Sequence, residues 1–280
     1  MDPDARRTWT VGRLAGAPLA VSPWSLATLA VVVVLAFRVL DAQVPRAPWA
    51  LAAAALTGVL VTASVALHEL AHALVARRVG VPVERVVITS LGARVSLDER
   101  ALRPGTTALV ALAGPALSLV LGGLAWAAST AAPDGGLVRW ALLIVAVVNG
   151  ATGAMNLLPA APMDGGKVLA AGVWAATGDR QRGTVVSAWG GRVLAVVVVL
   201  VLVVRPLVVG GRVELLLVVL AVLWAGFLWA AAGSSLRAAR SARRVGALDL
   251  RRLVVPAVGL PGTDTVAALD ALRGDVGPGA

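Results

Sequence analysis

The chain has 280 residues, of which 59% are hydrophobic and 14% are charged, and its mean hydropathy is +0.87. This composition excludes a soluble domain, whose apolar share is roughly one half. The apolar runs are helix-length and nearly uncharged, which excludes a membrane β-barrel with its short alternating strands. We therefore predict an α-helical membrane protein.

The net charge of +10 comes from arginines that are scattered in short loops without interleaved aromatic residues. This pattern favours a lipid bilayer as the partner and argues against nucleic acid. There is no cysteine, so a metal site would have to use histidine and carboxylate. The first residues lack the features of a cleaved secretory signal, so we expect the first apolar run to be a retained span.

Six apolar runs are long enough to cross a bilayer. They lie at residues 24–40, 50–76, 106–131, 137–158, 193–209 and 213–233. A weaker helix is expected at about 164–177, after two prolines that break the fourth run. Lys and Arg concentrate in the connections on the side of both chain ends, which predicts cytoplasmic termini and a cytoplasmic segment at 1–23 before the 24–233 six-span domain.

Two connecting segments depart from the helical pattern. Residues 81–97 are rich in β-branched residues between Pro82 and Gly92, which predicts a short strand or hairpin between spans two and three, although an ordinary loop fits the pattern equally well. Residues 234–249 are rich in arginine and predict a basic juxtamembrane helix on the lipid surface. Residues 250–280 predict a strand, a turn and the start of a helix, which are too few to fold alone.

The stretch LHELAHALVARR, residues 67–78, contains the only two histidines of the chain. Residues four apart share one face of a helix, so His68 and His72 can bind one ion while Glu69 projects beside it. A pair of hydrogen-bonded core histidines is the alternative. Because ionisable groups at membrane depth are costly and mark function, we favour a zinc site.

Asp164 is the best candidate for a third zinc ligand. Most of the other carboxylates lie in loops or tails or at a helix end, whereas Asp164 lies in NLLPAAPMDGG, residues 156–166, where prolines break a membrane helix. Gly165 and Gly166 would admit another helix at close range. The alternative is a turn at the cytoplasmic surface. Three protein ligands would leave zinc a fourth position for water, which is the arrangement of catalytic sites.

These residues together predict peptide hydrolysis. Zinc lowers the pKa of a bound water from ~15.7 to ~7. Glu69 would accept the proton of that water, direct it at a peptide carbonyl and pass the proton to the leaving nitrogen. Asn156 is a candidate for a hydrogen bond to the substrate or the oxyanion.

A transmembrane substrate has to be unwound before its peptide bonds are accessible, and the 81–97 region could accept the extended chain on a strand edge. Candidate substrate contacts there are Val87, Thr89 and Gly92. Asn149 is seven residues before Asn156 and thus on a similar face of the fourth span. It is a further candidate contact, or else an interhelical packing residue.

Four segments resemble the site-2 protease family of intramembrane zinc metalloproteases, over about residues 9–235. They are HELAH at 68–72, NLLPAAPMDGGKV at 156–168, LAGPALSL at 112–119 and WTVGRLAGAPLAVSPW at 9–24. The resemblance implies that His68, His72 and Asp164 bind one zinc ion per chain. It also implies that Glu69 is the catalytic base and that Asn156 lies near the substrate.

Two positions depart from the family pattern. Lys167 stands where arginine is usual, and Ala93 follows Gly92 where bacterial members often have a pair of glycines. Residues 250–280 are similar to the opening of a CBS domain, a cytoplasmic nucleotide-sensing module carried by one branch of the family.

The sequence thus predicts an intramembrane zinc endopeptidase of the bacterial inner membrane that cleaves transmembrane segments of single-span proteins, and it leaves homo-oligomerisation open. A metal transporter is one alternative, but it needs a continuous polar pathway, and the outer halves of the predicted spans are nearly free of polar residues. A catalytically silent scaffold is another, and the intact Glu69 argues against it.

Overall fold

The computed structural model describes residues 8–14, 17–89, 92–210 and 214–246. It confirms the helical membrane fold, because six helices in this part of the chain are long and apolar enough to cross a membrane. They are Trp24–Gln43 (α1), Ala50–Arg78 (α2), Pro104–Ala131 (α3), Leu137–Asn156 (α4), Arg180–Val208, and the Leu215–Arg243 part of Leu215–Gly246 (α8). Apart from the end of α8, they belong to one compact unit that ends at Ala242.

The fifth membrane helix begins well before the predicted residue 193. It comprises α6 (Arg180–Val199), a short π-helical segment (Leu200–Val204) and α7 (Arg205–Val208). The Asp179 carboxylate caps its first turn by accepting hydrogen bonds from the backbone N–H groups of Gln181 and Arg182. Hydropathy missed this start because the capped turn is polar.

The last span and the basic segment form one helix. α8 continues from the predicted span through the arginine-rich residues up to Gly246, with no break at residue 233. The predicted weaker helix is present as α5 (Asp164–Thr177), which ends at Gly178 with a left-handed backbone, φ 70°. The CBS-like tail at 250–280 lies outside the described residues.

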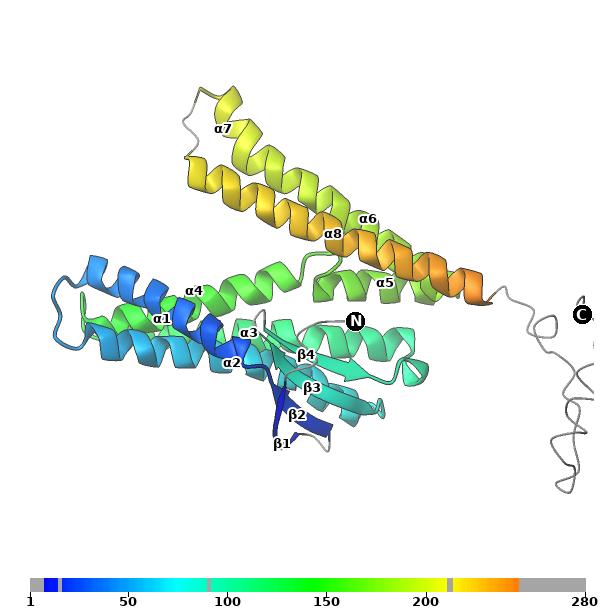
Figure 1. Cartoon of the computed structure of the whole chain (residues 1–280), viewed down its shortest axis with the longest axis horizontal. Coiled ribbons are helices and arrows are strands. Elements are labelled where there is room, and N and C mark those ends of the chain that lie inside the picture. Colours follow the sequence, from blue (N-terminus) through cyan, green and yellow to red (C-terminus); the bar gives the residue numbers. More distant parts are fainter. Residues whose placement is uncertain (1–7, 15–16, 90–91, 211–213, 247–280) are drawn as a thin grey trace, which may run out of the picture. The chain divides into compact units, whose positions relative to one another are not determined.

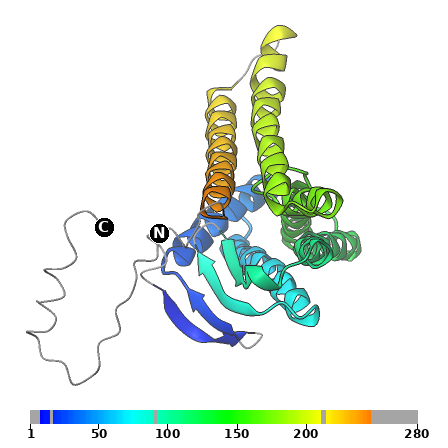
Figure 2. The same ribbon diagram turned by 90° about the vertical axis from the view of Figure 1, so that its right-hand side faces the viewer.

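A four-stranded sheet lies beside one end of α1 and α2 (Figures 1 and 2). Its strands, in spatial order, are β1 (Trp9–Leu14), β2 (Ala17–Val21), β3 (Val83–Thr89) and β4 (Gly92–Leu97). The hairpin of β3 and β4 confirms the strand region predicted at 81–97. A 3-10 turn, Glu99–Ala101, follows it and leads to α3.

The sequence patterns did not predict the strands β1 and β2, which lie inside the segment 1–23. β2 pairs with β3 in parallel, and Leu19 is opposite Val86. Local pattern could not show this pairing, because the partner of β2 is distant in the sequence and because Gly12 and Pro18, which are rare in strands, interrupt the strand pattern of residues 9–21. As a result β3 is paired on both sides, whereas β4 is an edge strand within the described part of the sheet.

Helix α3 packs against both α2 and α4 (Figure 1). Small residues permit this close packing: a β-carbon at Gly122 would lie 2.9 Å from the backbone nitrogen of Gly150 on α4. Large apolar side chains such as Leu124 and Trp126 are exposed on the outside of α3, where lipid would cover them. The buried polar side chains of the unit include His68, His72 and Asp164.

Candidate metal centre

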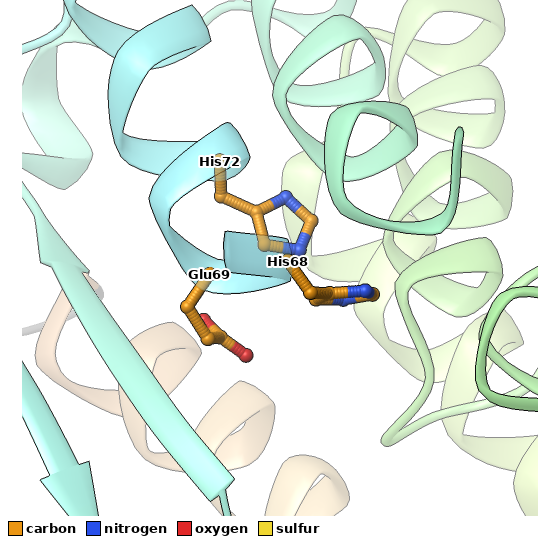
Figure 3. A group of neighbouring side chains, drawn as sticks. All are labelled: His68, Glu69 and His72. Atoms are coloured by element: carbon orange, nitrogen blue, oxygen red, sulfur yellow. The ribbon is translucent and has the colours of Figure 1, made fainter. Parts of the chain in front are cut away.

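The two histidines project from one face of α2, and only 4% of His68 and 5% of His72 is exposed. Figure 3 shows their imidazole rings next to each other, with the Glu69 side chain leaving the helix beside them. The ring centroids are 4.9 Å apart. One ligand atom from each of His68, Glu69 and His72 lies within 4.8 Å of the others. The four-residue spacing thus produces the cluster that it predicts.

Both imidazoles are oriented by α3. His72 Nδ1 lies 2.6 Å from the carbonyl oxygen of Val110, which can only accept, so Nδ1 carries the proton and the Nε2 of a neutral ring keeps its lone pair. His68 Nδ1 lies 2.9 Å from the hydroxyl of Ser118. In metal-binding histidines the ring nitrogen that does not bind the metal, here Nδ1, is typically held by such a hydrogen bond. The sequence patterns predict no role for these α3 residues.

Asp164 meets the two histidines from the opposite side. Its Oδ2 lies 3.3 Å from His68 Nε2 and 3.2 Å from His72 Nε2. Asp164 is the first residue of α5, where the helix dipole favours a negative charge. The structure therefore brings together the three residues that the sequence analysis selected as ligands.

Lys167 binds the other carboxylate oxygen of Asp164, with Nζ 2.7 Å from Oδ1. Asp164 lies outside the six spans, and burial on its own would raise the pKa of its carboxyl. When the imidazoles also carry a proton at Nε2, their hydrogen bonds to Asp164, together with the charge of Lys167, outweigh burial and hold this pKa well below its ordinary range. Asp164 is therefore an anion with one oxygen directed at the histidines.

The donor set fits a zinc ion. Zinc bonds of about 2.0–2.1 Å in a tetrahedral site place ligand atoms about 3.3–3.4 Å apart. The two distances from Asp164 Oδ2 to the imidazole Nε2 atoms, 3.3 Å and 3.2 Å, match this spacing. The ligand atoms of Glu69 and the histidines are known only to lie within 4.8 Å of one another. Asp164, with its shorter distances, is therefore the better third ligand, and Glu69 remains for another role.

The glycines after Asp164 serve a different contact from the one predicted. The sequence predicts that Gly165 and Gly166 allow another helix to pack closely, but the atoms nearest to them are backbone atoms of the preceding turn. A β-carbon at Gly166 would lie 2.5 Å from the carbonyl carbon of Ala160, and one at Gly165 would collide with the carbonyl oxygen of Leu157. The prolines turn the chain back over the start of α5, and the two glycines make room for that turn.

A cavity of about 1120 Å³ lies against this cluster. His68, Glu69 and His72 form part of its wall, and Asp164 and Lys167 form another part. The remaining wall includes residues of β4, α3 and α4, together with Glu84, Pro162 and Arg180. Residues of the β4 region on the wall include Val95, Ser96, Leu97 and Asp98.

The two asparagines of α4 are placed differently. Asn156 lines the cavity, and its Nδ2 donates to the backbone oxygen of Thr152 at 3.0 Å. Asn149 is buried and does not belong to the cavity lining; its Nδ2 donates to the oxygen of Val145 on its own helix.

Of the strand residues predicted to contact substrate, Val87 is not among the described residues on the cavity wall. Val87 lies in the central strand β3, opposite Ala20 of β2 and Arg94 of β4, so its backbone is not at an edge. The unpredicted hairpin of β1 and β2 covers that side. Thr89 and Gly92 are paired at the turn end of β3 and β4, and the side chain of Thr89 lies outside the described part of the structure.

The fold and the site define a multi-span membrane protein with an HExxH helix and a converging aspartate. The sequence profile of Peptidase family M50 matches residues 56–137 and 128–203, which together are more than half of the chain. The chain therefore belongs to peptidase family M50, and the resemblance to the site-2 proteases is confirmed.

Two curated relatives are similar over the same core. "Putative zinc metalloprotease Rip3" of Mycobacterium tuberculosis is 40% identical over 146 residues, which are 50% of this chain and 37% of that protein. "Putative zinc metalloprotease sll0528" of Synechocystis is 34% identical over 182 residues, which are 63% of this chain and 47% of that protein. The chain thus spans less than half the length of these two relatives.

A solved structure, "Site-2 Protease from Methanocaldococcus jannaschii", has a similar fold. Its TM-score is 0.54 and its sequence identity 21%, and the match covers 91% of this chain and 99% of that one. At this identity the likeness concerns the fold alone.

Proposed function

We propose that this chain is an intramembrane zinc endopeptidase that hydrolyses peptide bonds within or near the transmembrane segments of single-span membrane proteins. The observation that carries the proposal is the approach of Asp164 Oδ2 to the Nε2 atoms of His68 and His72, on the wall of a cavity that Glu69 also lines. The names of the relatives and the family support zinc as the metal, and the single ligand set of His68, His72 and Asp164 supports one ion per chain.

In this proposal His68, His72 and Asp164 hold the ion. When bound, zinc supplies a Lewis acid that makes water a stronger nucleophile and polarises the substrate carbonyl. The α3 contacts keep the Nδ1 atoms occupied, so both Nε2 atoms are presented to the same place. Lys167 keeps Oδ1 of Asp164 engaged and leaves Oδ2 as the coordinating oxygen.

Glu69 acts as general base and then as general acid. Its carboxylate accepts a proton from the attacking water, whose oxygen forms the new bond to the carbonyl carbon. As the carbon–nitrogen bond breaks, Glu69 donates that proton to the leaving nitrogen, so one water is consumed and the base is regenerated.

Substrate backbone is held by two parts of the cavity wall. The amide of Asn156 donates one N–H to Thr152, and its second N–H is the donor that we assign to a substrate carbonyl. The edge strand β4 offers backbone hydrogen bonds to an unwound substrate segment next to Val95, Ser96 and Leu97. This assignment replaces Val87 with the β4 residues that line the cavity.

We also propose the bacterial inner membrane as the location, with both termini in the cytoplasm. Arg77 and Arg78 at the end of α2 support this orientation, since they follow His72 by less than two turns and basic residues favour the cytoplasmic side. The metal then lies nearer the cytoplasmic face than the outer one.

The test compares cells that produce the wild-type chain or the Glu69→Gln variant. Quantitative proteomics of membrane fragments should find single-span stubs that accumulate with Glu69→Gln, and the purified wild type in proteoliposomes should cleave those stubs. Glu214→Gln, an exposed glutamate just before α8, is the matched control and should behave as wild type. Equal cleavage by the wild type and Glu69→Gln would contradict the mechanism, as would a purified protein that binds no zinc.

A further inference from the structure

Three residues of α3 face the histidines in a single row. Val110, Gly114 and Ser118 are spaced four apart and so lie on one side of the helix. The row runs against the direction of α2, because Val110 meets His72 and Ser118 meets His68. The spacing of the histidines on α2 is thus matched by an equal spacing on α3.

The outer two members of the row fix the far sides of the rings. The Val110 carbonyl and the Ser118 hydroxyl both contact Nδ1 atoms, which leaves both Nε2 atoms facing the space between the helices. Ser118 is 1% exposed, so water does not compete for its hydroxyl. An imidazole held in this way cannot turn its Nε2 away without losing a buried hydrogen bond.

Gly114, in the middle of the row, borders that space directly. A β-carbon there would lie 2.5 Å from His68 Nε2 and still closer to His72 Nε2. Real β-carbons do not approach other heavy atoms within 3.0 Å. Even alanine would therefore occupy the place in front of both ligand atoms, which is the place that an ion bound to them needs.

We propose that α3 makes the histidine pair a metal site, with Val110 and Ser118 as positioning residues and Gly114 as the residue that keeps the ion's space open. This inference rests on the proposed zinc site. It assigns a role to the glycine and serine of LAGPALSL, residues 112–119, that concerns metal occupancy and not the fold.

Other glycines of α3 separate this role from helix packing. The atoms nearest to a β-carbon at Gly122 would be backbone atoms of α4, with Gly150 nitrogen at 2.9 Å and Ala146 oxygen at 3.1 Å. One at Gly123 would meet nothing within 4 Å. The same helix therefore contains one glycine against ligand atoms, one against a neighbouring backbone, and two, Gly105 and Gly123, against open space.

The experiment substitutes each of these glycines by alanine in the full chain. Zinc per chain, zinc affinity against a competing chelator, and the melting temperature of the metal-free protein are measured. Gly114→Ala should still fold but fail to hold stoichiometric zinc, and its metal-free melting temperature should be lower than that of wild type because the displaced rings lose buried hydrogen bonds. Gly122→Ala should melt earlier and keep one zinc per folded chain, and Gly123→Ala should change neither quantity.

Wild-type zinc affinity in Gly114→Ala would overturn the proposal. So would a Gly114→Ala chain that does not fold, because it would place Gly114 with the packing glycines. If the wild type itself binds no zinc, the proposed function fails as well, so the two failures are distinguishable.

A serine pair tests the positioning role independently. Ser118→Ala should weaken zinc binding by about 10–100-fold, the usual effect of removing a partner of a metal-binding histidine. Ser129→Ala is the control, because Ser129 is also buried on α3 but bonds the oxygen of Trp126 on its own helix. Equal zinc affinity in the two variants would contradict the role of Ser118.

Discussion

Helices α2 and α8 are almost equally apolar, yet they bury different kinds of side chain. Each has a 29-residue stretch that is long and apolar enough to span a membrane, with a mean hydropathy of 2.1 in α2 and 2.5 in α8 over 18 residues. The buried side chains of α2 include Thr57, Ser64, His68 and His72. Those of α8 within its described residues are alanines and leucines, among them Leu228.

The difference follows from the neighbours of each helix. α2 packs against α3, and the start of α5 meets its histidines, so each imidazole has polar partners on both ring nitrogens. The buried part of α8 packs against α6 through apolar clusters that contain Ala195, Val198 and Ala188. Polar groups are tolerated at membrane depth only where other elements satisfy them.

The largest effect should come from removing the carboxylate that meets the α2 histidines. Asp164→Ala leaves the zinc ion only two of its three proposed protein ligands, His68 and His72. Zinc affinity should therefore fall by more than ~100-fold and cleavage should be lost, whereas removing a residue that only hydrogen-bonds a ligand typically costs about 10–100-fold. Chelator competition and the stub-cleavage assay measure this. Asp134→Ala, which removes an exposed acid paired with Arg139, should match wild type in both. Retention of stoichiometric zinc by Asp164→Ala would exclude it as a ligand.

A polar residue placed in α8 should be costly where α2 tolerates one. Leu228 of α8 is fully buried against α6. Leu228→Asn would put an amide among apolar side chains and should lower the free energy of unfolding by about 2–5 kcal/mol. Leu228→Met keeps the volume and should cost less than ~1.5 kcal/mol. Unfolding in mixed micelles compares the two. If Leu228→Asn were as stable as Leu228→Met, the difference between α2 and α8 in buried polar side chains would not depend on hydrogen-bond partners from neighbouring elements.

A smaller effect is expected at the outermost partner of the metal centre. Lys167→Met frees Oδ1 of Asp164 and should weaken zinc binding by about tenfold, the low end of outer-partner effects. Lys167→Arg, which restores the residue usual in the family, should bind zinc as wild type does. If the methionine and arginine variants have equal zinc affinity, the ion pair does not orient Asp164.

Much of this arrangement could be predicted from local sequence. Hydropathy located the spans, and the isolated HExxH and the broken helix at Asp164 selected three residues that the structure brings together. The α3 partners could not be predicted, because Val110 acts through its backbone and the contact of Ser118 with His68 depends on how two helices are aligned. The start of α6 depended on a polar cap at Asp179, and β1 and β2 on pairing with a distant strand.

The parallel pairing of β2 with β3 constrains how the chain threads the membrane. Only α1, α2 and their connections lie between these strands, so the chain leaves the sheet, crosses the bilayer, returns and forms hydrogen bonds with its own earlier segment. An odd number of crossings between them would put the two strands on opposite sides. The sheet can therefore close only after both helices are inserted, so the pairing of Leu19 with Val86 reports that the HExxH helix has reached its final topology.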